Sequence, residues 1–130
     1  MRILVLGKRH YTGKDLLCDT YGRLFHLPEE LARQGHQVRG FAADYHQGGN
    51  VFHQTTSTGV VWTNFPVSRW QGLLAYWRQL RQTLQDFRPE VIWVASDAFH
   101  VIFGAWLQRR YGIPVVADLY DHFEAFKATQ

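Results

Sequence analysis

The sequence predicts an α/β fold in which helices flank a parallel sheet. Two matching segments indicate it: MRILVLGKRHYTGK at the N-terminus and YGIPVVADLYD, Tyr111 to Asp121, are each a short apolar strand that runs into a polar loop. Helical patterns separate the strands, and this alternation is typical of parallel sheets with right-handed crossovers. Ligands of open α/β sheets bind beyond the carboxyl ends of the strands. We therefore expect both polar loops to border one crevice.

The first strand, helix and second strand follow in order. The run from Arg2 to Gly7 is apolar, which predicts a strand buried on both faces, and Lys8 to Asp19 is expected to be a loop. Leucines at helical spacing then predict a helix that Gly35 ends, and Pro28 inside it predicts a kink or a later start. These leucines are Leu24, Leu27 and Leu31. The second strand is expected from Gln37 to Ala42.

A polar, glycine-rich excursion occupies the middle of the chain, from Asp44 to Thr58. Within it, Val51 to Thr55 is a candidate for a short strand. Val60 to Thr63 is a stronger candidate, which Pro66 closes. A further strand is therefore expected before the longest helix.

The clearest helix begins near Ser68, which forms a predicted capping box with Gln71. Large apolar residues make one stripe at helical spacing, and Pro89 ends the helix. The stripe consists of Trp70, Leu73, Leu74, Trp77, Leu80, Leu84 and Phe87. We interpret it first as core or domain interface, and second as a ligand surface.

The last third of the chain repeats the pattern. Val91 to Ala95 is a predicted buried strand, and Ser96 or Asp97 is expected to cap a helix that runs to about Arg110. The next strand is expected from Val115 to Ala117.

After that strand, Asp118 to Phe126 is expected to be a loop and the beginning of a helix. The chain stops at Gln130 with this helix barely begun. We therefore expect the sequence to be truncated.

Length and composition limit the class of protein. A chain of 130 residues with 46% hydrophobic and 19% charged residues fits one globular domain. Its net charge of +3 is small and its basic residues are scattered, so we expect no nucleic-acid partner. The single cysteine, Cys18, fits a reducing compartment. No apolar run suits a membrane span or a signal peptide, so a cytoplasmic protein is expected.

The loop after the first strand is the first candidate site. Gly13 and Lys14 lie where a glycine-containing loop can present backbone N–H groups and positive charge to phosphate. The spacing matches neither G-x-G-x-x-G nor a Walker loop, which disfavours a nicotinamide cofactor. An ordinary solvated loop is the alternative.

Polar residues also follow the later strands. Asp97 either caps a helix or takes part in catalysis, and His100, one turn further, can hydrogen-bond a substrate hydroxyl or act as a base. A denser cluster follows the last strand, where a carboxylate can accept the proton of an attacking hydroxyl; the alternative is a solvated helix start. This cluster consists of Asp118, Asp121, His122 and Glu124. The same set could bind a metal, but its spacing matches no firm metal-ligand pattern.

Four of these segments resemble the N-terminal domain of family 4 glycosyltransferases of the GT-B type. They are MRILVLGKRHYTGK, then LARQGHQV at Leu31 to Val38, then FRPEVIWVAS, and finally YGIPVVADLYD. They occur in the family's order and cover nearly the whole chain. The resemblance implies a Rossmann-like domain that binds the acceptor, partnered by a C-terminal domain, absent here, that grips most of the nucleotide-sugar donor.

The resemblance also implies the reaction. It is transfer, with retention of anomeric configuration, from a nucleotide sugar to a hydroxyl of a glycan or lipid, without a required metal or other cofactor. Gly13 and its neighbours would approach the donor phosphates, and the loop from Asp118 to Glu124 would line the acceptor side. Two histidines of the family are replaced here, one within Val94 to Ser96 and one at Tyr120. The catalytic candidates in their place are Asp97, His100 and Asp121. The fragment alone is expected to be inactive.

Two other classes of protein stay as alternatives. The many tryptophans and phenylalanines favour a stand-alone flavodoxin-like module that acts through protein contacts without catalysis. The first strand and loop favour a dinucleotide-dependent oxidoreductase. Saturable binding of a nucleotide sugar would count against the first, and lack of nicotinamide binding against the second. Basic and aromatic residues also suit peripheral contact with a membrane.

Overall fold

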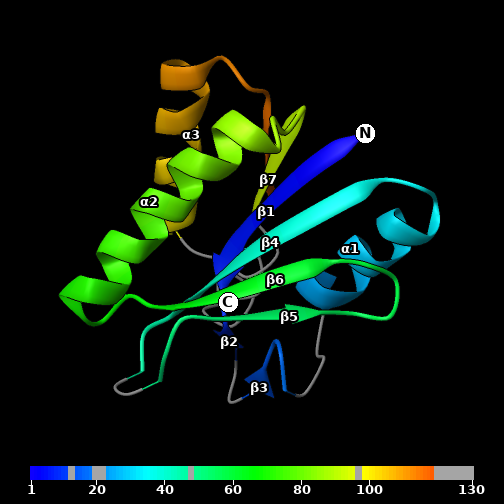
Figure 1. The fold of residues 1–130 in the computed structure, drawn as a ribbon. Helices are drawn as coiled ribbons and strands as arrows, with labels where there is room; N and C mark the ends of the chain where they lie inside the picture. Colours follow the sequence, from blue (N-terminus) through cyan, green and yellow to red (C-terminus); the bar gives the residue numbers. More distant parts are fainter. Residues whose placement is uncertain (12–13, 19–22, 47–48, 96–97, 119–130) are drawn as a thin grey trace, which may run out of the picture.

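The computed structural model describes residues 1–11, 14–18, 23–46, 49–95 and 98–118, and its centre is a six-stranded sheet (Figure 1). The strand order is β5–β6–β4–β1–β7–β8. The parallel strands are β1 (Arg2–Lys8), β4 (Gln37–Asp44), β6 (Val61–Pro66), β7 (Val91–Ala95) and β8 (Val115–Asp118). At one edge, β5 (Phe52–Thr55) pairs antiparallel with β6. The predicted α/β, Rossmann-like arrangement is confirmed.

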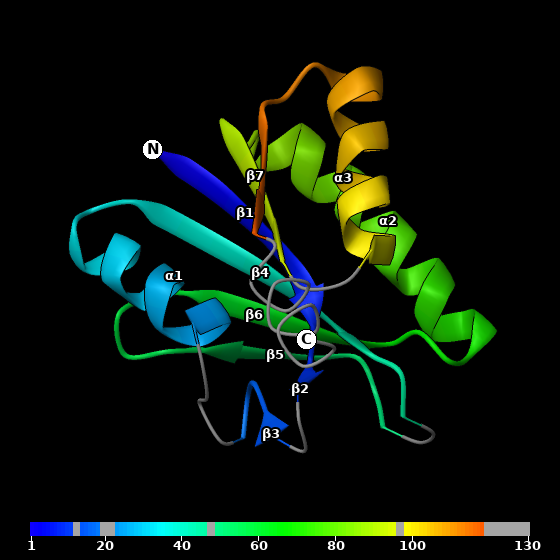
Figure 2. The same cartoon turned by 180° about the vertical axis from the view of Figure 1, so that it is seen from behind.

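The helices lie on both faces of the sheet. α1 (Arg23–Arg33) covers one face, and α2 (Trp70–Asp86) with α3 (Ala98–Tyr111) covers the other, as two opposite views show (Figures 1 and 2). Side chains of β1 alternate between the two layers. Ile3 and Val5 belong to the core on the α1 side, and Leu4 and Leu6 to the core on the α2 and α3 side. Burial on both faces accounts for the continuous apolar run of this strand.

All five parallel strands end at the same edge of the sheet, which we call the carboxyl edge. Their last residues are Lys8, Asp44, Pro66, Ala95 and Asp118. β1 is central, with Ile3 opposite Val38 of β4 on one side and Val91 of β7 on the other. The predicted convergence of the strand ends of β1 and β8 on one edge is therefore confirmed.

The segment after β1 has more structure than the predicted loop. β2 (His10–Tyr11) and β3 (Lys14–Asp15) pair as a small antiparallel hairpin. The Leu16 N–H donates to the Arg9 carbonyl at 2.7 Å, which closes this hairpin. Short strands without an apolar repeat give little signal in a sequence.

Pro28 does not delay α1. The helix begins at Arg23 and includes Pro28, so the predicted later start is wrong. Proline removes one helical hydrogen bond, and the Pro28 side chain is buried. At the other end, Gly35 adopts φ +97°, a left-handed conformation that favours glycine, and its predicted role in ending the helix is confirmed.

The start of α2 differs from the predicted capping box and stripe. The N-cap is Arg69, without a side-chain cap, and the Ser68 hydroxyl donates instead to the His46 carbonyl at 3.1 Å. A Cβ at Gly72 would overlap the carbonyl oxygen of Pro66, so this glycine lets α2 pack closely on the sheet and sets its rotation. The residues of α2 that this rotation buries are Gly72, Tyr76, Leu80 and Thr83. The first residues of the predicted stripe are exposed, namely Trp70, Leu73 and Leu74.

None of the helices in the described ranges combines the length and the apolar composition needed to cross a membrane.

Candidate functional site

Arg9 organises one half of the carboxyl edge. Its guanidinium forms a bidentate pair with Asp15, with Nε to Oδ1 and Nη2 to Oδ2 both at 2.9 Å. Nη1 donates to Asn64 Oδ1 at 3.1 Å and lies 3.6 Å from Asp44 Oδ2. The Arg9 backbone N–H also donates to the Ala43 carbonyl at 2.9 Å. One side chain thus joins the hairpin to the ends of β4 and β6. We call Arg9, Asp15, Asp44 and Asn64 the Arg9 network.

The charges of the Arg9 network reinforce one another. Burial raises the pKa of Asp15, but hydrogen bonds from Arg9 and from the N–H groups of Leu17 and Cys18, with the Arg9 charge, outweigh burial and hold that pKa well below 3.8. Burial lowers the pKa of Arg9, but the hydrogen bond and charge of Asp15 outweigh burial, so this pKa is raised above its ordinary value. At neutral pH the pair is therefore fully ionised.

Two stacked histidines stand beside this network. The rings of His10 and His46 lie parallel, with centroids 4.0 Å apart and an interplanar angle of 6°. His10 Nε2 lies 3.5 Å from Asp44 Oδ1, which also accepts the His46 backbone N–H at 3.0 Å. An imidazole beside a carboxylate can hold or pass on a proton. This pair therefore offers acid–base chemistry at the carboxyl edge.

The same three side chains are the candidate metal ligands in the described part of the chain. The donor atoms of His10, Asp44 and His46 lie within 4.8 Å of one another. A metal ion lies in the plane of any imidazole that binds it, and two parallel stacked rings share no such point. One ring would have to rotate before both could bind one ion. As arranged, the cluster fits proton chemistry better than chelation.

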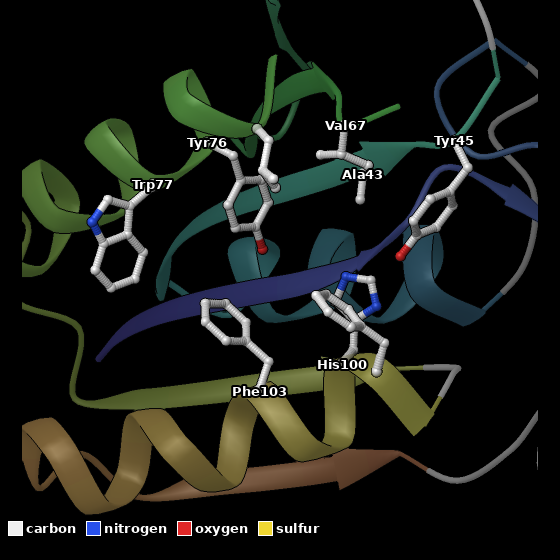
Figure 3. Close-up of a pocket in the computed structure, with 9 residues that line it drawn as sticks. Ala43, Tyr45, Val67, Tyr76, Trp77, His100 and Phe103 are labelled. Carbon is white, nitrogen blue, oxygen red and sulfur yellow. The ribbon is translucent and has the colours of Figure 1, made fainter. Parts of the chain in front are cut away.

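The other half of the carboxyl edge is an apolar pocket of about 480 Å³ between the beginnings of α2 and α3 (Figure 3). It is lined by Ala43, Tyr45, Val67, Leu73, Tyr76, Trp77, Phe99, His100 and Phe103. Small-molecule sites typically have this size, an apolar lining and a few polar groups that orient the ligand. Here the Tyr45 hydroxyl points toward the His100 ring, while Tyr76 and Phe103 face each other across the pocket (Figure 3).

Three predicted site residues lie within the described ranges, and for two of them the structure also describes the side chain. His100 is in the first turn of α3 and only 1% exposed, and its ring meets Phe99 edge-on with centroids 5.6 Å apart. Asp118 is the last residue of β8 and is half-buried. Both therefore lie at the carboxyl edge, one in the pocket and one at the end of the outermost strand. Their chemical roles stay predictions.

The other predicted site residues cannot be placed in the same way. Lys14 begins β3, and its backbone pairs with Tyr11. The rest lie outside the described residues, namely Gly13, Asp97, Asp121, His122 and Glu124. The proposed helix cap at Ser96 and the family position at Tyr120 also lie outside them.

Sequence reasoning missed most of the Arg9 network. Asp44 and Asn64 belong to β4 and β6, which extend two or three residues beyond the predicted ends at Ala42 and Thr63. If both strands had been predicted at their full length, Asp44 and Asn64 would have stood out as polar residues near the carboxyl ends of parallel strands, where ligands bind. Asp15 gave no signal, because its importance depends on the fold of the hairpin.

Comparison with known proteins gives the family. A family model described as a glycosyl transferase 4-like domain matches residues 23–128. The match spans β4 to β8 and the pocket, and it begins after Arg9 and the β2–β3 hairpin. None of the curated proteins matches the chain closely enough to count as a relative. Because the family match covers most of the sequence and the fold agrees with it, the chain belongs to the family of glycosyl transferase 4-like domains.

Proposed function

We propose that this domain is the acceptor-binding half of a retaining glycosyltransferase. The donor is a nucleotide sugar and the acceptor is a hydroxyl of a glycan or lipid. The observation that carries the proposal is the pocket at the carboxyl edge of a sheet that belongs to a glycosyltransferase family. Open α/β sheets bind ligands at this edge. A C-terminal domain would hold most of the nucleotide across the cleft.

The reaction requires one bond to break and one to form at the sugar's anomeric carbon. The bond to the nucleoside diphosphate breaks, the bond to the acceptor oxygen forms on the same face, and the acceptor's proton leaves with a base. We assign Gly13 and Lys14 to the donor phosphates, and Asp118, His122 and Glu124 to the acceptor side. The candidates for catalysis are Asp97, His100 and Asp121.

The proposal requires no metal, because fixed cations and backbone N–H groups can stabilise a departing diphosphate. Chelation by EDTA is expected to leave transfer unchanged. The single cysteine fits a reducing compartment, and we propose the cytoplasm as the place of the reaction.

The test is transfer by the full-length protein with panels of uridine- and guanosine-diphosphate sugars and hydroxyl acceptors. The anomeric configuration of the product is read by NMR. His100→Gln is expected to lower kcat by roughly 10²-fold or more if the imidazole acts as the base. His26→Gln, an exposed position on α1, is the matched control.

Equal melting temperatures of the two variants are required before their rates are compared. Loss of kcat with an unchanged KM would support a catalytic role for His100. If the protein binds no nucleotide sugar, the proposed function is wrong, and the binding-module alternative takes its place.

A further inference from the structure

One face of the molecule exposes an unusual amount of apolar surface. α2 and α3 together present six exposed large apolar side chains, Trp70, Leu73, Leu74, Phe99, Ile102 and Trp106, which we call the apolar face. Trp70 is 74% exposed, Ile102 69% and Phe99 62%. Soluble monomers rarely expose contiguous apolar patches beyond a few hundred Å². A surface of this kind normally has a partner.

The apolar face borders the pocket, and ring contacts link its two helices. Leu73 of α2 and Phe99 of α3 line the pocket from its two sides. The Trp106 ring lies 5.7 Å from the Trp77 ring and 6.0 Å from the Phe103 ring, which joins the two helices further along. Helices that are apolar all round are normally covered on every side. α3 has this composition, yet one side of it is open.

The charges on these two helices are almost all positive. They carry four exposed arginines, Arg78, Arg81, Arg109 and Arg110. The acidic residue is Asp86, so the balance is four minus one, or +3. His100 also lies on α3 but is buried. An anionic partner therefore complements this face better than a neutral or basic one.

The arginines and the apolar side chains are separated along the helix axes. On each helix the arginines follow the apolar side chains in the sequence. At about 1.5 Å per residue, Arg78 lies roughly 6 Å beyond Leu74, and Arg109 roughly 5 Å beyond Trp106. Amphipathic elements on membranes bury their apolar side chains to about this depth, while cationic side chains stay at the headgroups.

We propose that the apolar face docks onto an anionic lipid bilayer. Trp70, Phe99 and Ile102 insert at the boundary between headgroups and acyl chains, where tryptophan is favoured. The arginines meet lipid phosphates. The pocket opens among the inserted side chains, so a hydrocarbon chain can enter it from the membrane beside the carboxyl edge. The choice of a lipid acceptor rests on the proposed function, whereas membrane binding itself does not.

The experiment is flotation of the purified chain with two kinds of vesicle, phosphatidylcholine alone and phosphatidylcholine mixed with phosphatidylglycerol. Binding to the anionic vesicles, weakened by salt and accompanied by a blue shift of tryptophan emission, is expected. The double variant Phe99→Ser with Ile102→Ser should weaken binding more than tenfold, because two exposed apolar side chains lose their transfer into lipid. Arg78→Gln should weaken binding about fivefold.

Matched controls lie on α1, across the sheet. Leu27→Ser removes an exposed apolar side chain, and Arg33→Gln removes an exposed charge. Both are expected to bind vesicles as the unchanged chain does. Because all four variants alter exposed residues, their melting temperatures should stay close to that of the parent.

Two results would overturn the inference. One is equal absence of binding to both vesicles. The other is a dimer in lipid-free buffer, seen by light scattering, that the Phe99 and Ile102 double variant abolishes, because the face would then be covered by a second copy. Vesicle binding without any recognition of nucleotide sugars would keep this inference and reject the proposed function.

Discussion

The two halves of the carboxyl edge differ in what their side chains already contact. In the Arg9 network, the guanidinium and the Asp15 carboxylate bind each other, and Asn64 and Asp44 occupy the remaining donors. In the pocket, aromatic walls enclose about 480 Å³ of open space. A network whose hydrogen-bonding groups already contact one another holds strand ends in place. An open apolar pocket, in contrast, can receive a ligand. We infer that the first half is scaffold and the second half is the binding region.

The scaffold role of Arg9 predicts the largest effect. Arg9→Ala would leave the Asp15 and Asp44 carboxylates, both mostly buried, without their cation. Removing one partner of such a pair costs about 3–5 kcal/mol. Urea unfolding measures this loss. Arg33→Ala breaks an exposed pair with Glu30 and should cost less than about 1 kcal/mol. Equal losses for the two variants would contradict the scaffold interpretation.

A second prediction concerns the wall of the pocket. Gly72→Ala places a Cβ against the Pro66 carbonyl, which is backbone and cannot move aside easily. α2 must shift, so we expect destabilisation of about 1–3 kcal/mol and a changed pocket. Thermal unfolding and near-UV circular dichroism measure both. The control is Gln82→Ala, an exposed position on α2. Gly59→Ala would be a poor control, because Gly59 has φ +97°, where an alanine is itself strained. If Gly72→Ala changed neither the thermal unfolding nor the near-UV spectrum, α2 would have room to move.

Acidification tests the charge of the Arg9 network. The pKa of Asp15 is lower in the folded state than its ordinary 3.8, so the folded state binds fewer protons than the unfolded state. The stability contributed by Asp15 is therefore present above pH 3.8 and is lost as the pH falls below it. Asp15→Asn should cost on the order of 1–2 kcal/mol at pH 7, and progressively less toward pH 3. A difference between the two proteins that is constant with pH would contradict this assignment.

The smallest predicted effect is at Ser68, where the two halves of the carboxyl edge meet. Ser68 donates to the His46 carbonyl and does not cap α2. Ser68→Ala should therefore cost no more than about 0.5 kcal/mol, as exposed substitutions usually do. Loss of a true N-cap would cost about 1 kcal/mol. Chemical denaturation with Ser57→Ala, an exposed turn residue, as control distinguishes the two.

The same contrast explains how much of this molecule the sequence could predict. Apolar runs predicted the parallel strands of the main sheet, and glycine at Gly35 correctly marked a helix end. The pocket was harder, because it depends on the rotation of α2, which contact between Gly72 and Pro66 sets. The Arg9 network was harder still. Its members are far apart in sequence, and only the parallel order of β1, β4 and β6 brings Asn64 to Arg9.

Of the candidate site, the sequence placed His100 and Asp118 at the carboxyl edge, because both follow or end predicted strands. Helical spacing grouped Trp70, Leu73 and Leu74 with buried residues in one stripe, although these three side chains are exposed. Periodicity defines a stripe on a helix, but the width of the buried part depends on the neighbouring elements. No local pattern could supply that information.

The central position of β1 has a consequence for how the protein is made. This strand precedes both of its neighbours, β4 and β7, in the chain, and Ile3 pairs with both Val38 and Val91. Partners so distant along the chain slow folding, because a long loop must close before the contact forms. Until β7 leaves the ribosome, the edge of β1 that pairs with it has no partner. This strand therefore depends on shielding until β7 has been made.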